Sequence, residues 1–165
     1  MESPEILFEK WYVTPLKVLE SIPGGDGGFV ALATSCFLYE RYATAVFKNS
    51  PNPTKADRDA KIRQFMIDFE VDEETAEAFW DVIRDGLLHS GMPKQGKHGK
   101  QVLPYWAFRH EFPKPVELTE HSGKRVLKIQ PWLVMDKVVS LWRRNLALLD
   151  QSDSFPWANV IPLPF

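Results

Sequence analysis

Residues 28 to 49 read GFVALATSCFLYERYATAVFKN, and this stretch carries the clearest helical pattern in the chain. Its apolar side chains recur at intervals of three, four and seven residues, which places them along one face of an α-helix. The pattern therefore predicts a long central helix that turns this face toward a core. The apolar face consists of Phe29, Leu32, Ala33, Cys36, Phe37, Ala43 and Phe47.

Glu40 falls on the same face of this helix. A carboxylate there is costly to bury unless a cation or several hydrogen-bond donors meet it. Two interpretations stay open. Glu40 either pairs with its neighbour Arg41 or lies at a solvated groove edge, or it is the partner of Arg84, which belongs to a polar motif farther along the chain.

Further patterned segments lie on both sides of the central helix. Helical spacing is found over residues 3–21, 54–69, 72–91 and 132–149. The glycine-rich run at residues 24–28 is expected to form a flexible turn; a phosphate-binding loop is the other interpretation, although the Lys-Ser/Thr ending of a P-loop is missing. Residues 92–113 have the composition of a loop.

Two short alternating segments precede the last helical pattern. Residues 116–119 and 125–129 flank a Ser122-Gly123 turn, as in a β-hairpin. The sequence thus predicts a mainly α fold, an antiparallel four- or five-helix bundle with a short β-hairpin insertion before the last helix. With 165 residues, no internal repeat and no long linker, we expect a single helical domain over residues 1–165.

Composition limits the classes of function. A formal net charge of -2 argues against a protein that holds duplex nucleic acid by neutralising many phosphates, but it leaves room for a small local RNA site. The single cysteine, Cys36, excludes an intramolecular disulfide framework. The acidic first ten residues lack the order of a signal peptide and no apolar run is long enough for a membrane span, so we expect a cytoplasmic protein without membrane contact.

Residues 84 to 91 read RDGLLHSG and end the helical pattern that begins at Asp72. One interpretation is an ordinary helix end, with Arg84 solvated and His89 capping free carbonyl groups before Gly91. The other is that Arg84 and His89 are presented to a phosphate. Five residues along an ideal helix separate two side chains by about 140°, so the pair shares a face only if the last turn unwinds near Gly86 or Gly91.

The six residues from Arg84 to His89 resemble the Arg, polar residue, x3, His signature of the HEPN superfamily, whose members are small helical bundles that commonly act as metal-independent endoribonucleases. Many members carry Asn after the Arg, where this chain has Asp85. The toxin branch that is modified on a tyrosine carries Tyr two residues after the His, and Gly91 stands there instead.

The resemblance implies a homodimer in which the Arg84/His89 motifs face each other across the two-fold axis. His89 would take the proton of an RNA 2'-hydroxyl, because imidazole exchanges protons readily near neutral pH. Arg84 would hold the non-bridging phosphate oxygens. Asp85 or Glu40 would orient one of these groups, and Ser90 would add a hydrogen bond to the phosphate. We expect neither a metal nor any other cofactor, because no tight ligand spacing such as H-E-x-x-H is present.

A basic segment follows the motif, and it forms either a mobile rim that attracts RNA or a solvated loop. Its members are Lys94, Lys97, His98 and Lys100. Single-stranded RNA is the expected substrate, because in-line attack needs backbone freedom that a duplex denies. The leading hypothesis is a ribonuclease acting as a toxin or defence effector, with an antitoxin or regulatory protein as a further partner. The alternative is a non-catalytic HEPN-like module that binds a nucleotide, RNA or protein.

Overall fold

The computed structural model describes residues 2–49, 57–98 and 101–149. The chain begins with a helical rod made of α1 (Pro4–Phe8) and α2 (Thr14–Glu20), joined by the wider π-helical turn Glu9–Val13. Ser3 caps its first turn by accepting a hydrogen bond from the Ile6 amide. Pro15 lies in the first turn of α2, where its missing amide proton is tolerated, so the rod continues past it.

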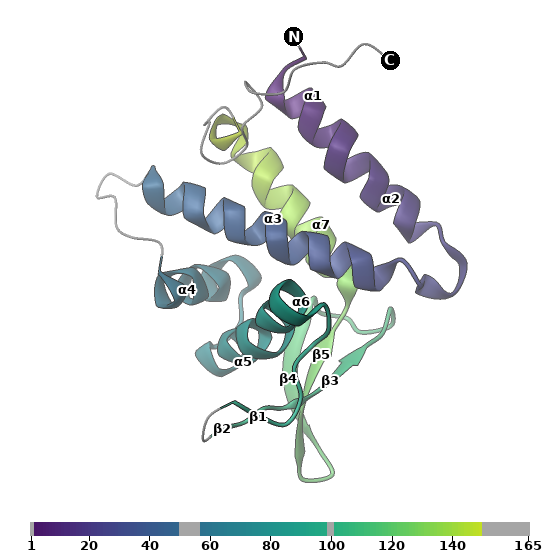
Figure 1. Cartoon of the computed structure of the whole chain (residues 1–165), viewed down its shortest axis with the longest axis vertical. Coiled ribbons are helices and arrows are strands. Elements are labelled where there is room, and N and C mark those ends of the chain that lie inside the picture. Colours follow the sequence, from purple (N-terminus) through teal and green to yellow (C-terminus); the bar gives the residue numbers. More distant parts are fainter. Residues whose placement is uncertain (1, 50–56, 99–100, 150–165) are drawn as a thin grey trace.

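The central helix predicted from the sequence is present as α3 (Gly28–Lys48). It lies between the α1–α2 rod on one side and α4 (Arg58–Phe69), α5 (Glu73–Ala78) and α6 (Asp85–Ser90) on the other (Figure 1). The last helix, α7 (Pro131–Arg144), packs along α3. The Trp142 indole donates a hydrogen bond of 3.1 Å to the Leu38 carbonyl group and ties these two helices together.

The buried face of α3 is broader than the predicted apolar stripe. Phe37 belongs to the stripe but is 41% exposed, whereas Leu38, Tyr39 and Tyr42 lie outside it and are buried. A stripe of period 3.6 assumes one packing partner. α3 contacts α2, α4, α6 and α7, so it buries several of its faces at once. The prediction that a single apolar stripe faces the core was therefore wrong about which side chains of α3 are buried.

Between α6 and α7, three strands form a small sheet: β3 (Tyr105–Phe108), β4 (Val116–His121) and β5 (Lys124–Ile129), in the order β3-β5-β4. β4 and β5 pair antiparallel around Ser122 (φ 51°) and Gly123 (φ 72°), which are the left-handed conformations that a tight two-residue turn needs. β3 pairs with β5 in parallel register, Tyr105 opposite Val126.

The loop predicted over residues 92–113 is therefore wrong in part. Besides β3, this segment contains the short antiparallel pair β1 (Lys97–His98) and β2 (Gln101–Val102). The aromatic run at residues 105–108 pairs with β5, which follows about twenty residues later in the chain. A partner at that distance leaves no signal in the local sequence.

The mainly helical class is confirmed, with a small three-stranded sheet beside the helices (Figure 1). Buried side chains from the helices and the sheet form one hydrophobic core. Within the described ranges, no helix combines the length and the apolar character needed to cross a membrane. The predicted helix start at Thr54 and Lys100 of the basic segment lie outside the described residues.

Candidate functional site

One continuous helical segment carries the RDGLLHSG motif. Asp72 caps it by accepting the Thr75 amide at 2.8 Å, and Glu73 and Glu74 in the first turn suit the positive end of the helix dipole. The segment passes from α5 through a π-helical turn (Phe79–Arg84) into α6. Gly91, with φ at 70°, ends it, and the Gly91 amide donates to the Leu87 carbonyl group at 3.1 Å. The predicted termination at Gly91 is confirmed.

Two carboxylates hold the guanidinium group of Arg84. Its Nε donates to Oε2 of Glu40 at 3.1 Å, and its Nη2 atom donates to the same oxygen. Its Nη1 atom donates to Oδ1 of Asp85 at 2.5 Å. Only 16% of the Arg84 side chain is exposed. Of the two interpretations of Glu40, the pair with Arg84 is the one found.

Two lysines extend this pair into a chain of alternating charges. Lys61 on α4 donates to the other oxygen of Glu40 at 3.0 Å, and the Lys94 ammonium group lies 3.7 Å from Oδ2 of Asp85. The series Lys61, Glu40, Arg84, Asp85, Lys94 contains three cations and two carboxylates, so it carries a formal charge of +1. We call these five residues the Arg84 cluster.

Burial and pairing act against each other on the ionisable groups of the Arg84 cluster. Burial raises the pKa of Glu40, but the hydrogen bonds from Arg84 and Lys61 lower it more, and the net pKa is below the ordinary value. Burial lowers the pKa of Arg84, but the hydrogen bonds to Glu40 and Asp85 raise it more, and the net pKa is above the ordinary value. Both groups therefore stay charged at neutral pH.

Gly86 explains how Lys94 reaches Asp85. The chain after the helix folds back across this residue, and the Lys94 amide donates to the Val82 carbonyl group at 2.8 Å. A Cβ atom at position 86 would lie 2.6 Å from both the Lys94 nitrogen and the Met92 carbonyl oxygen. The three residues of the R-D-G triplet thus have distinct structural roles: Arg84 and Asp85 form the ion pairs, and Gly86 admits the returning backbone.

His89 and Ser90 lie apart from the Arg84 cluster. Both are exposed in the last turn of α6, and neither side chain has a hydrogen bond or ion pair within the described part of the chain. His89 therefore does not cap its own helix end. The backbone stays helical from Arg84 to Ser90, so within one chain the Arg84 and His89 side chains leave the helix about 140° apart.

The structure brings together three of the predicted catalytic residues, Glu40, Arg84 and Asp85, and one predicted RNA-binding residue, Lys94. Lys97 and His98 lie in β1, and their side chains are outside the described atoms, as is the whole of Lys100. In the described ranges, no group of three or more His, Cys, Asp or Glu side chains is arranged to hold a metal ion.

Two members of this neighbourhood, Trp80 and Lys61, were not predicted from the sequence as site residues. The Arg84 guanidinium carbon lies 5.4 Å from the centre of the Trp80 ring, a cation–π contact that the spacing of four residues on a helix could have indicated. Lys61 comes from α4 and left no such signal, because only the packing of α4 against α3 brings it to Glu40.

Comparisons of the chain with family models, with curated proteins and with solved structures gave no significant match.

Proposed function

We propose that this protein is a HEPN-type endoribonuclease that cleaves single-stranded RNA without a metal ion, as a toxin or defence effector, and that its helices form the four- or five-helix bundle typical of that superfamily. The observation that carries the proposal is the pairing of Arg84 with Glu40 and Asp85 on the helix that also presents an exposed His89, whose side chain has no partner among the described residues. A cation fixed in direction and an imidazole open to solvent are the two groups that the chemistry requires.

The two carboxylates orient Arg84 but engage only part of its hydrogen-bonding capacity. The bonds to Glu40 and Asp85 engage three of the five N–H donors of a guanidinium group, and within the described residues two donors remain for phosphate oxygens. The Arg84 cluster keeps a formal charge of +1, which favours an anion next to it. Glu40 and Asp85 act here as positioning residues, because they reach the substrate only through Arg84.

His89 takes the proton of the 2'-hydroxyl group as that oxygen attacks the adjacent phosphorus atom. The P–O bond to the 5'-oxygen of the next nucleotide breaks, that oxygen takes a proton from water and leaves as a 5'-hydroxyl group, and a 2',3'-cyclic phosphate remains on the other product. Ser90, exposed beside His89, donates a hydrogen bond to a phosphate oxygen, and Lys94 adds positive charge. Arg84 stabilises the additional negative charge of the pentacoordinate transition state.

The angle of about 140° between Arg84 and His89 requires a second chain to complete the site. Two large apolar side chains flank the Glu40–Arg84 pair: Phe37, one turn before Glu40 on α3, and Leu88, one turn after Arg84 on α6. They are 41% and 36% exposed. Exposed apolar side chains next to a polar site favour a protein interface there, and a two-fold axis through it would bring the motif of each chain to the other.

A non-catalytic binding module is the second candidate, and one observation favours it. Most of the Arg84 side chain is buried, and its guanidinium group already has two carboxylate partners. A module of this kind would bind a nucleotide, RNA or protein through the same surface without cleaving it.

The proposal is tested by incubating mixed single-stranded RNAs in EDTA with purified wild type, Arg84→Ala and His89→Ala, followed by end-group analysis. We expect cleavage that resists EDTA, yields 2',3'-cyclic phosphate ends and is lost in both folded variants. Equal activity in all three proteins would contradict the proposal. RNA binding without cleavage by any of them would favour the binding module.

A further inference from the structure

β4 is an outer strand of the three-stranded sheet. Gln130 donates to the Pro115 carbonyl group at 3.0 Å, which makes residues 115 and 130 a hydrogen-bonded pair that continues the β4–β5 register. Such pairs alternate along antiparallel strands. Residues 117, 119 and 121 therefore direct their backbone groups toward β5, and Leu118 and Glu120 direct theirs away from it.

No strand in the described part of the chain pairs with these outward backbone groups. β4 is an outer strand of its sheet, and within the described part of the chain no backbone hydrogen bond joins Leu118 or Glu120 to another element. Leu118 is half-buried and Glu120 is exposed. An edge strand in this state is a template on which an extended chain can pair.

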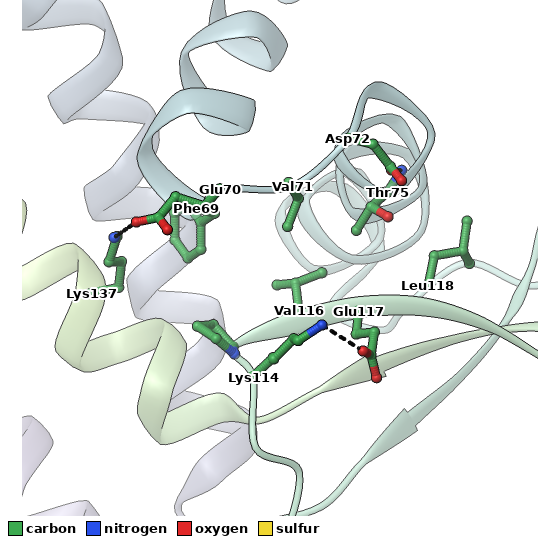
Figure 2. A pocket seen from close by; sticks show the side chains of 11 residues that line it. Phe69, Glu70, Val71, Asp72, Thr75, Lys114, Val116, Glu117, Leu118 and Lys137 are labelled. Atoms are coloured by element: carbon green, nitrogen blue, oxygen red, sulfur yellow. Dashed lines mark hydrogen bonds and ion pairs between the residues drawn. The ribbon is translucent and has the colours of Figure 1, made fainter.

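A pocket of about 490 Å³ adjoins this edge (Figure 2). Val71 enters it from the connection between α4 and α5, and Val116 and Leu118 enter it from β4. Val71 and Leu118 are half-buried and provide the accessible apolar part of the lining, whereas Phe69 and Val116 are buried beneath it. A smaller pocket continues along β4 past Leu118 to Glu120 and Arg125.

The rim of the two pockets carries an excess of negative charge. Three cations on it are each paired with a carboxylate: Lys137 with Glu70, Lys114 with Glu117, and Arg125 with Glu74. Asp72 and Glu120 also line the pockets, and neither has a cation partner among the described residues. The rim thus has a formal charge of -2, which favours a basic partner.

We propose that the β4 edge and its two pockets bind an extended basic peptide segment of a partner protein. The segment adds a strand to β4 through the backbone groups of Leu118 and Glu120, places an aliphatic side chain in the larger pocket, and sets Lys or Arg side chains beside Asp72 and Glu120. A second copy of this chain is a poorer occupant, because it would bring its own rim of charge -2 against the first. This surface is separate from the Arg84 cluster and does not depend on the proposed ribonuclease activity.

The test selects peptides that bind the immobilised whole protein from a phage-displayed library of random ten-residue sequences. Three variants are used alongside. Glu120→Pro removes the outward amide and is tolerated at a strand edge. Glu120→Lys changes the charge, and Glu111→Lys makes the same change at another exposed carboxylate outside the two pockets.

We expect enriched peptides with alternating aliphatic residues and an excess of Lys and Arg. Their affinity should fall at least about fivefold in Glu120→Lys and Glu120→Pro and stay unchanged in Glu111→Lys. Hydrogen exchange followed by NMR should slow at the amides of Leu118 and Glu120 in the complex. The proposal is overturned if no peptide prefers wild type over Glu120→Pro, if the selected peptides are acidic, if exchange at Leu118 and Glu120 is unchanged, or if β4 pairs with β4 of a second copy.

Discussion

Glu40 and Arg84 are 44 residues apart in the sequence and form an ion pair between α3 and the end of the π-helical turn before α6. Lys61 completes the environment of Glu40 from a third helix. The pair therefore fixes the position of the candidate site relative to the core. It also makes the stability of the fold depend on the charge of Glu40 and on its bonds to Arg84.

Replacing Glu40 tests this link. Glu40→Gln leaves Arg84 and Lys61 without their shared anion, and since the side chains are only partly buried we expect the free energy of unfolding to fall by about 1–2 kcal/mol. Chemical denaturation at pH 7 measures it. Glu20→Gln, which removes an exposed carboxylate bonded to Lys17, is the control and should change stability by less than about 0.5 kcal/mol.

The same pair predicts a pH dependence. Because the pKa of Glu40 is lower in the folded protein than in the unfolded chain, its contribution to stability is complete above the unfolded pKa of about 4.3 and is lost as the pH falls through the folded pKa. Denaturation at a series of pH values from 7 to 3 should show a smaller loss of stability in Glu40→Gln than in wild type. Parallel curves for the two proteins would contradict this prediction.

Gly86→Ala should destabilise the protein although alanine favours helices by about 1 kcal/mol over glycine. The new Cβ atom would lie 2.6 Å from backbone atoms of Met92 and Lys94, which cannot rotate away. We expect a net loss of about 1–3 kcal/mol and a lower melting temperature. Ser90→Ala, at an exposed position of the same helix, should leave the melting temperature nearly unchanged; an equal effect of both substitutions would speak against the close approach.

His89→Ala separates activity from stability. The side chain is exposed and has no hydrogen bond within the described residues, so its removal should leave the denaturation midpoint unchanged. If His89 is the base, RNA cleavage should fall by about 100-fold or more.

Arg84→Lys should lower both activity and stability, since an ammonium group cannot reproduce the bonds of a guanidinium group to Glu40 and Asp85. Single-turnover cleavage and denaturation of the same samples would measure both effects.

The proposed dimer predicts the effect of a charge in the apolar surface beside Arg84. Leu88→Glu should shift the protein from dimer to monomer in sedimentation experiments and should abolish cleavage, because a carboxylate is costly to bury in an interface. Ile67→Glu is the matched control, since Ile67 is 71% exposed on α4 and lies outside this surface. A wild type that sediments as a monomer at all concentrations would contradict the dimer.

Much of the fold could be predicted from local patterns. The helical spacing of residues 28–49, the acidic first turn after Asp72 and the stop at Gly91 each depend on neighbours within one or two turns, and each is present in the structure. The rotation of α3 and the strands within residues 97–108 could not be predicted, because they depend on partners far along the chain.

For the candidate site, the sequence by itself determined that Arg84, Asp85 and His89 lie at a helix end and that Gly91 closes it, because backbone propensity and helix spacing are local properties. Only the tertiary structure decided between Arg41 and Arg84 as the partner of Glu40, brought Lys61 into the Arg84 cluster, and gave Gly86 its role against Met92 and Lys94. Those contacts join segments that are distant in sequence. Their geometry is set by how the helices pack, and packing is a property of all the buried side chains together.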